Sequence, residues 1–165
     1  MSEFHFEIKG DYNDLLRNGF EFLEAACRCA GTDETGTIHI LGGNKPTILP
    51  AATAVNSAFA CEMFLKALLQ KEGTQYPTNK DGHNLVKLFD LLLPETKKRI
   101  NDFFGYKEKT GQPLFEIFAN LHPKDFTEVR YYVTKPGLQG FSPITVYTYA
   151  FNLGQITKHL LGNNN

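Results

Sequence analysis

The segment from Ala51 to Leu69 constrains the fold most, because it is apolar around nearly its whole circumference yet carries polar residues. A helix that is apolar on all sides is buried inside a protein. A charged side chain in such a helix costs free energy unless it has a partner. The polar residues in question are Asn56, Glu62 and Lys66. We therefore expect a helical bundle whose central helix carries a buried polar cluster.

Apolar residues recur at helical spacing along most of the remaining chain. The predicted helices cover residues 11–30, 50–72, 83–93, a segment from Pro94 that carries Ile100, Phe103 and Phe104, then 114–121, 125–133 and a last helix from Pro143 to about residue 160. Ser142 is the predicted N-cap of the last helix, although its β-branched and tyrosine content leaves a strand as the alternative. Residues 1–10 indicate an extended arm, and a strand or hairpin could interrupt the long connection over 31–50.

Length and composition indicate that residues 1–165 form a single domain, because 42% of the residues are hydrophobic, which is enough for a full core. We expect an all-α, antiparallel bundle of four or more helices. The net charge is −1, which gives no overall field to attract nucleic acid or an anionic membrane. The densest basic stretch holds Lys97, Lys98, Arg99, Lys107 and Lys109. Solvated lysines on a surface helix explain this stretch more simply than a phosphate-binding face.

The cysteines predict the cellular compartment. Cys27, Cys29 and Cys61 are odd in number, lack a paired zinc-ligand spacing and fall within apolar helical patterns. Buried thiols in a reducing compartment explain them better than disulfides, a metal site or a nucleophile. The N-terminal residues lack an export signal, and two charges in the longest apolar segment argue against a membrane span. We expect a cytoplasmic protein without a membrane segment.

Glu62 and Lys66 are four residues apart, the spacing of a supporting ion pair on a helix. A surface pair is the simpler alternative. Against it, Asn56, Glu62, Lys66 and Gln70 share one arc of a helix whose neighbours are apolar, which favours a polar seam within a buried surface. Arg130 is the leading candidate partner for Glu62, because its guanidinium lies among apolar neighbours and needs a planar acceptor.

His83 follows Gly82 at a predicted helix start, where its imidazole could cap the helix or face the polar seam. A structural role is expected before a catalytic one. The remaining histidines have no ligand spacing with one another or with acids, so neither a metal nor a cofactor is expected. Residues 42–47 contain two glycines and a lysine at the wrong spacing for a phosphate loop, and we interpret them as a turn. Nucleophile-elbow, zinc-protease and dinucleotide motifs do not occur in the sequence.

Taken together, three segments resemble the HEPN family (higher eukaryotes and prokaryotes nucleotide-binding). They are Ala54 to Leu69, Gly82 to Phe89, and Arg130-Tyr131, and the resemblance covers mainly residues 50–160. It implies an antiparallel helical bundle and a homodimer. It also implies a role in RNA handling, nucleotide binding, or a toxin–antitoxin or defence system, with a nucleotidyltransferase, RNA or a nucleotide as candidate partner.

Many active HEPN proteins are metal-independent ribonucleases that use an arginine followed four to six residues later by a histidine. This chain departs from that pattern, because none of its four arginines has a histidine at that distance. Arg130 is followed by Tyr131 and Tyr132, which supply no imidazole for proton transfer. No catalytic residue is therefore carried over from the family.

These observations favour a non-catalytic binding or dimerisation module. One alternative is a divergent metal-independent ribonuclease that uses His83 and Arg130. Another is a small-ligand or nucleotide sensor whose pocket is the polar seam. In each case the candidate binding residues are Asn56, Glu62, Lys66, His83, Arg130 and Tyr131.

Overall fold

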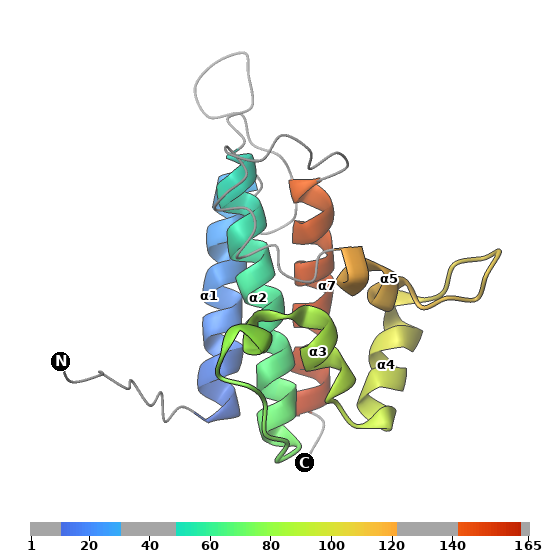
Figure 1. Ribbon diagram of the computed structural model, residues 1–165. Helices are drawn as coiled ribbons and strands as arrows, with labels where there is room; N and C mark the ends of the chain where they lie inside the picture. The colour runs from blue at the N-terminus through green and yellow to red at the C-terminus, as the bar shows by residue number, and fades with distance from the viewer. Residues whose placement is uncertain (1–10, 31–48, 122–141, 163–165) are drawn as a thin grey trace.

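The computed structural model describes residues 11–30, 49–121 and 142–162 (Figure 1). Regular structure in these residues is helical, apart from an isolated bridge between Tyr106 and Pro113, so the predicted all-α class is confirmed. The elements are α1 (Tyr12–Ala30), α2 (Pro50–Lys71), the 3-10 helix η1 (Lys80–His83), α3 (Leu85–Asp90), α4 (Pro94–Phe104), α5 (Leu114–Leu121) and α7 (Pro143–Gly162).

Three long helices form the body of the molecule. α2 packs against both α1 and α7, and it runs antiparallel to α1 and in the same direction as α7 (Figure 1). η1 and α3 cross the C-terminal half of α2, and α4 with α5 lies on the far side of α7 from α1. α2 is long and apolar enough to cross a membrane, but 67% of its apolar window is buried inside the protein. Its burial confirms the central helix expected from the sequence.

Capping residues begin α1 and α7 at the positions predicted from the sequence. The Oδ1 of Asp11 accepts hydrogen bonds from the backbone N–H groups of Asn13 and Asp14, at 2.8 and 3.1 Å. The Oγ of Ser142 accepts from the N–H of Thr145 at 3.3 Å, so Ser142 caps α7 as predicted. The strand alternative for this segment is wrong.

The ring of Phe64 on α2 lies at the centre of the bundle, where it packs against a glycine on each of the two neighbouring helices. A Cβ atom on Gly19 of α1 would lie 2.5 Å from the ring of Phe64, and one on Gly154 of α7 would lie 2.9 Å from it. Both separations are shorter than van der Waals contact. The bundle therefore needs a glycine on each side of this ring to bring its three long helices together.

The predicted helix over 83–93 is shorter in the structure, where α3 spans Leu85–Asp90, and Asn84 sets its later start. Asn84 has extended backbone angles, and its side chain accepts a hydrogen bond from the N–H of Lys87 at 3.2 Å. Asn84 thus separates α3 from η1, to which His83 belongs. The predicted arm at 1–10, most of the connection over 31–50 and the predicted helix over 125–133 lie outside the described residues.

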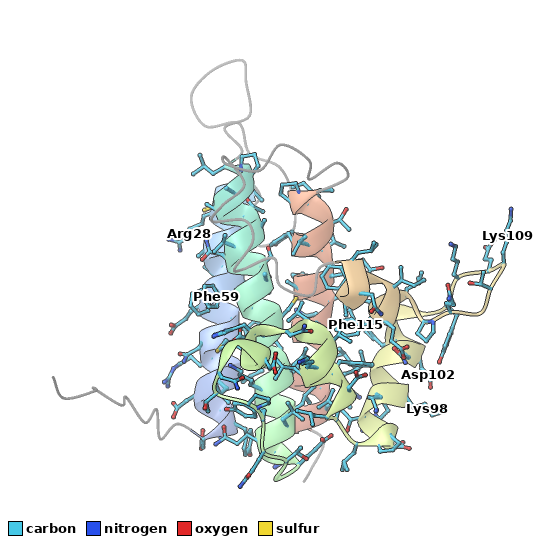
Figure 2. All side chains as sticks on the ribbon, in the orientation of Figure 1. Arg28, Phe59, Lys98, Asp102, Lys109 and Phe115 are labelled. Atoms are coloured by element: carbon cyan, nitrogen blue, oxygen red, sulfur yellow. The ribbon has the colours of Figure 1, made fainter. Side chains whose placement is uncertain are left out.

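An aromatic cluster attaches α4 and α5 to α7. Tyr149 of α7 stacks on Phe118 of α5 with ring centroids 4.1 Å apart, and on Phe104 of α4 with centroids 5.2 Å apart. Phe115 of α5 is fully buried beside them (Figure 2). Of the three apolar residues named for α4, Ile100 is buried and Phe104 packs against the core, whereas Phe103 is 48% exposed.

Candidate functional site

Glu62 lies at the centre of the polar cluster expected on α2. Its side chain is 3% exposed, and its Oε1 accepts a hydrogen bond from the Nζ of Lys66 at 2.6 Å. Lys66 is one helical turn further along α2, and its side chain is 12% exposed. The buried ion pair predicted from the sequence is confirmed, and the surface-pair alternative is wrong.

His83 brings a second donor to Glu62 from outside α2. Its Nδ1 lies 3.0 Å from Oε2 and 3.2 Å from Oε1 of Glu62. An ionised carboxylate can only accept hydrogen bonds, so Nδ1 carries a proton in this pair. With a side chain that is 36% exposed, His83 is the cluster member nearest to solvent. We call Glu62, Lys66 and His83 the Glu62 brace.

Tyr76 extends the Glu62 brace along the loop that follows α2. The Nζ of Lys66 lies 5.4 Å from the centre of the Tyr76 ring, a cation–π distance. Burial raises the pKa of the Tyr76 phenol, and the nearby negative charge of Glu62 raises this pKa further. Sequence reasoning did not select Tyr76, because a single tyrosine in a polar loop carries no periodic signal that shows which way it faces.

The local sequence explains how His83 reaches Glu62. A Cβ atom on Gly82 would lie 2.0 Å from the carbonyl oxygen of Pro77, so only glycine lets the chain fold this closely on itself. The side chain of Asn79 accepts from the N–H of Asp81 at 3.0 Å and caps η1. The loop is thus shaped to point His83 at α2.

Each residue of the Gly82-His83-Asn84-Leu85 segment has a separate structural task. Gly82 permits the tight approach, His83 bonds Glu62, Asn84 caps α3 and Leu85 enters the core with 3% exposure. The sequence left two roles open for His83, a helix cap or a contact with the polar seam. The structure assigns the cap to Asn84 and the seam contact to His83.

The other predicted site residues take different places. The side-chain amide of Asn56 donates to the carbonyl of Ala52 at 2.8 Å, within α2 and one turn earlier in the helix. Arg130 and Tyr131 lie outside the described residues, so the expected contact between Glu62 and Arg130 stays a prediction. The structure therefore brings together Glu62, Lys66 and His83, and adds Tyr76.

In the described part of the chain, potential metal ligands are not clustered and the three cysteines are thiols. Within it, no group of three or more histidine, cysteine, aspartate or glutamate side chains is arranged to hold a metal ion. Cys27 and Cys61 are buried and Cys29 is half-buried, and all three remain thiols. Within the described residues, Glu62 is the only buried residue that carries a charge, and the other buried polar residues are Thr53, Ser57, Asn101 and Thr157.

A groove of about 160 Å³ runs between α1 and α7. Its walls are mostly apolar and include the half-buried ring of Phe20 and the ring of Phe151, which is 39% exposed. Glu24 and Gln155 contribute its polar rim. We call this surface the α1/α7 groove. The complete lining is Phe20, Leu23, Glu24, Cys27, Tyr147, Phe151 and Gln155.

Comparison with models of known families, with curated proteins and with solved structures finds no match to this chain.

Proposed function

We propose that this protein is a non-catalytic, homodimeric binding module of the HEPN type. The observation that carries this proposal is the bonding of Glu62. Its carboxylate is nearly inaccessible to solvent, and Lys66 and His83 donate to it from two sides. The residues that underlie the family resemblance thus act together as an internal support.

The energetics of the Glu62 brace favour a structural role. Removing one partner of a buried ion pair typically costs about 3–5 kcal/mol, because the remaining charge stays buried. The brace also joins η1 to α2 across 21 residues of sequence. A cluster with these properties holds the loop after α2 in place. The positive charge of Lys66 also partly neutralises the negative charge of the Glu62 carboxylate that contacts His83.

The composition of the α1/α7 groove is an argument for a homodimer. An isologous dimer buries the same patch on both subunits, and such patches have apolar centres with aromatic residues. Phe151 and Ile144 lie seven residues apart on α7 and are each 39% exposed, so they form one apolar row beside the groove. A second copy of the chain would remove this row from water.

Light scattering coupled to gel filtration tests the dimer at micromolar concentration. We expect the wild type to elute with twice the mass of one chain, and Phe151→Glu to elute with the mass of one chain. The matched control is Phe103→Glu, which puts the same charge on an exposed aromatic of α4, outside the groove. A wild type with the mass of one chain contradicts the proposal. Equal mass for the two variants contradicts the assignment of the groove.

A second function, metal-independent RNA cleavage by His83 and Arg130, is favoured by one observation. The bond from Nδ1 to Glu62 orients a partly exposed imidazole, as general acid–base catalysis requires. The test is incubation of structured and single-stranded RNA with the protein in the presence of a chelator. We expect no cleavage.

Three variants decide between the two functions if RNA is cleaved. His83→Ala and Arg130→Ala would both abolish activity that belongs to this protein, while His159→Ala, an exposed histidine on α7, would leave it unchanged. Circular dichroism shows whether each variant is folded. Cleavage by the wild type that the first two substitutions remove, and the third does not, would replace the binding proposal by the enzyme.

A further inference from the structure

One face of α4 and the hairpin after it place aromatic rings beside basic side chains. Residues four apart on a helix are neighbours on its surface, so Lys98 and Asp102 form one row and Arg99 and Phe103 form the next. Tyr106, just past the helix end, continues the first row because its hydroxyl bonds Asp102. We call these five residues, with Lys107 and Lys109 of the hairpin, the α4 face.

The two aromatic rings of the α4 face are held in place yet stay open to solvent. The hydroxyl of Tyr106 donates to Oδ1 of Asp102 at 2.8 Å, and the ring remains 47% exposed. Phe103 is 48% exposed, and it packs edge-on against Phe104, 5.6 Å between ring centres. Phe104 in turn belongs to the aromatic cluster on α7. Because these contacts already restrict the two side chains, a base that stacks on either ring would cost little further conformational entropy.

The hairpin extends the basic part of this face away from the bundle. The N–H of Lys107 donates to the carbonyl of Gln112 at 2.8 Å, and the N–H of Gly111 donates to the carbonyl of Lys107 at the same distance. Gly111 has a φ of 65°, which favours glycine and closes the turn. Figure 2 shows Lys109 at the outer end of this arm.

The local charge of this segment is positive, although the protein as a whole is nearly neutral. The sequence alone favoured solvated lysines for this stretch, and the exposed rings of Phe103 and Tyr106 beside them are the observation that favours a phosphate-binding face instead. Residues 94–113 contain five bases and three acids. One of these acids, Asp102, already accepts from Lys98 at 2.5 Å and from Tyr106. Arg99, Lys107 and Lys109 are exposed, and within the described residues none of the three forms an ion pair.

We infer that the α4 face binds single-stranded nucleic acid. Proteins bind single strands by stacking bases on aromatic rings while cations follow the phosphates, and a site of this kind takes roughly 4–16 nucleotides. Base pairing would keep the faces of the bases stacked on one another, so a duplex cannot use Phe103 and Tyr106 in this way. This inference goes beyond the proposed function, since the α4 face is separate from both the Glu62 brace and the α1/α7 groove.

Fluorescence anisotropy with labelled 12-nucleotide oligouridine RNA, oligothymidine DNA and a 12-base-pair duplex tests the inference at 50 and 200 mM salt. We expect at least one single strand to bind more tightly than the duplex. Binding of both single strands indicates recognition of base and phosphate, and binding of RNA alone adds a contact to the 2′-hydroxyl. Absence of single-strand binding at 50 mM salt, or equal affinity for the duplex, would overturn the inference.

Ring variants test the stacking part of the inference. A base stacked on an aromatic ring contributes about 1–3 kcal/mol, so Phe103→Ala and Tyr106→Ala should each weaken binding by roughly 5-fold or more. Tyr106→Phe keeps the ring and loses only the bond to Asp102, so it should retain most of the affinity. Unchanged affinity in both alanine variants would overturn the assignment of this face.

Charge variants test the phosphate part against a matched control. Each phosphate contact to a single strand contributes about 0.7 to the slope of log affinity against log salt, so Arg99→Ala/Lys109→Ala should reduce the slope by roughly 1.4. Arg17→Ala/Arg28→Ala removes the same net charge from α1, on the opposite side of the molecule from Lys109, and should leave the slope unchanged (Figure 2). Equal effects of the two pairs would overturn the inference. The mass of the wild type by light scattering tests the dimer independently.

Discussion

Replacement of Glu62 by glutamine is the sharpest test of the Glu62 brace. The substitution keeps the size and shape of the side chain and removes its charge. Lys66 then retains a positive charge at a site where only 12% of its side chain reaches solvent, and His83 loses a charged acceptor. We expect Glu62→Gln to fold with a markedly lower free energy of unfolding.

The burial of the partners sets the size of this loss. Breaking a fully buried ion pair costs about 3–5 kcal/mol. Because Lys66 and His83 keep some access to water, the expected loss is near the lower limit, about 3 kcal/mol. With a urea dependence of about 2 kcal/mol per molar for a small protein, the unfolding midpoint should fall by roughly 1.5 M.

Urea unfolding followed by circular dichroism measures this loss, and a second ion pair of the same spacing provides the control. Lys98 and Asp102 are also four residues apart on a helix, but both side chains are exposed. We expect Asp102→Asn to leave the unfolding midpoint unchanged. The double variant Glu62→Gln/Lys66→Met should lose less stability than the sum of its single variants, because the two side chains interact directly.

Two results would refute this reasoning. Equal midpoints for Glu62→Gln and Asp102→Asn would show that burial does not strengthen the pair on α2. Strict additivity of Glu62→Gln and Lys66→Met would show that the contact between them does not contribute to stability. Either result would also remove the main support for a structural role of the Glu62 brace.

Three further predictions concern packing and titration. Gly19→Ala should lower the free energy of unfolding by about 1–3 kcal/mol, because its methyl group would meet the ring of Phe64 at 2.5 Å. Gly82→Ala should displace the loop around Pro77 and shift the imidazole signals of the adjacent histidine in the NMR spectrum, since its Cβ would meet a backbone carbonyl. The pKa of Tyr76 is raised in the folded protein, so its contribution to stability is present below pH 10 and should be lost as the pH rises above 10. Tyr76→Phe should make unfolding less sensitive to pH in that range.

Each of these predictions has a control in the chain. Gly162→Ala adds a methyl group at the exposed end of α7, where nothing lies within 4 Å, and should not destabilise the protein. Gly19→Ala with the stability of the wild type would contradict the packing of the three long helices. An unchanged imidazole in Gly82→Ala would contradict the loop geometry, and equal pH dependence of Tyr76→Phe and wild type would contradict the burial of this phenol.

Local physical chemistry made most of the helices predictable. Helix periodicity, the cap at Ser142 and proline at the first turn of α2, α4 and α7 depend on residues a few positions apart, and the structure confirms them. The pair of Glu62 and Lys66 belongs to the same class, because 3.6 residues per turn bring residues four apart to one face. The helix predicted over 83–93 was placed too early at its start, since periodicity alone does not show that Asn84 bonds the backbone of the next turn.

The sequence by itself determined that α2 is a buried central helix and that its charges need partners. Which partner each charge finds was decided by the tertiary structure, because His83 and Tyr76 reach α2 only after the chain reverses direction at Gly73. The exposure of Phe103 was likewise decided by where α4 packs on α7. Contacts of this kind depend on the relative positions of whole elements, and those positions result from the summed burial of many side chains rather than from any local pattern.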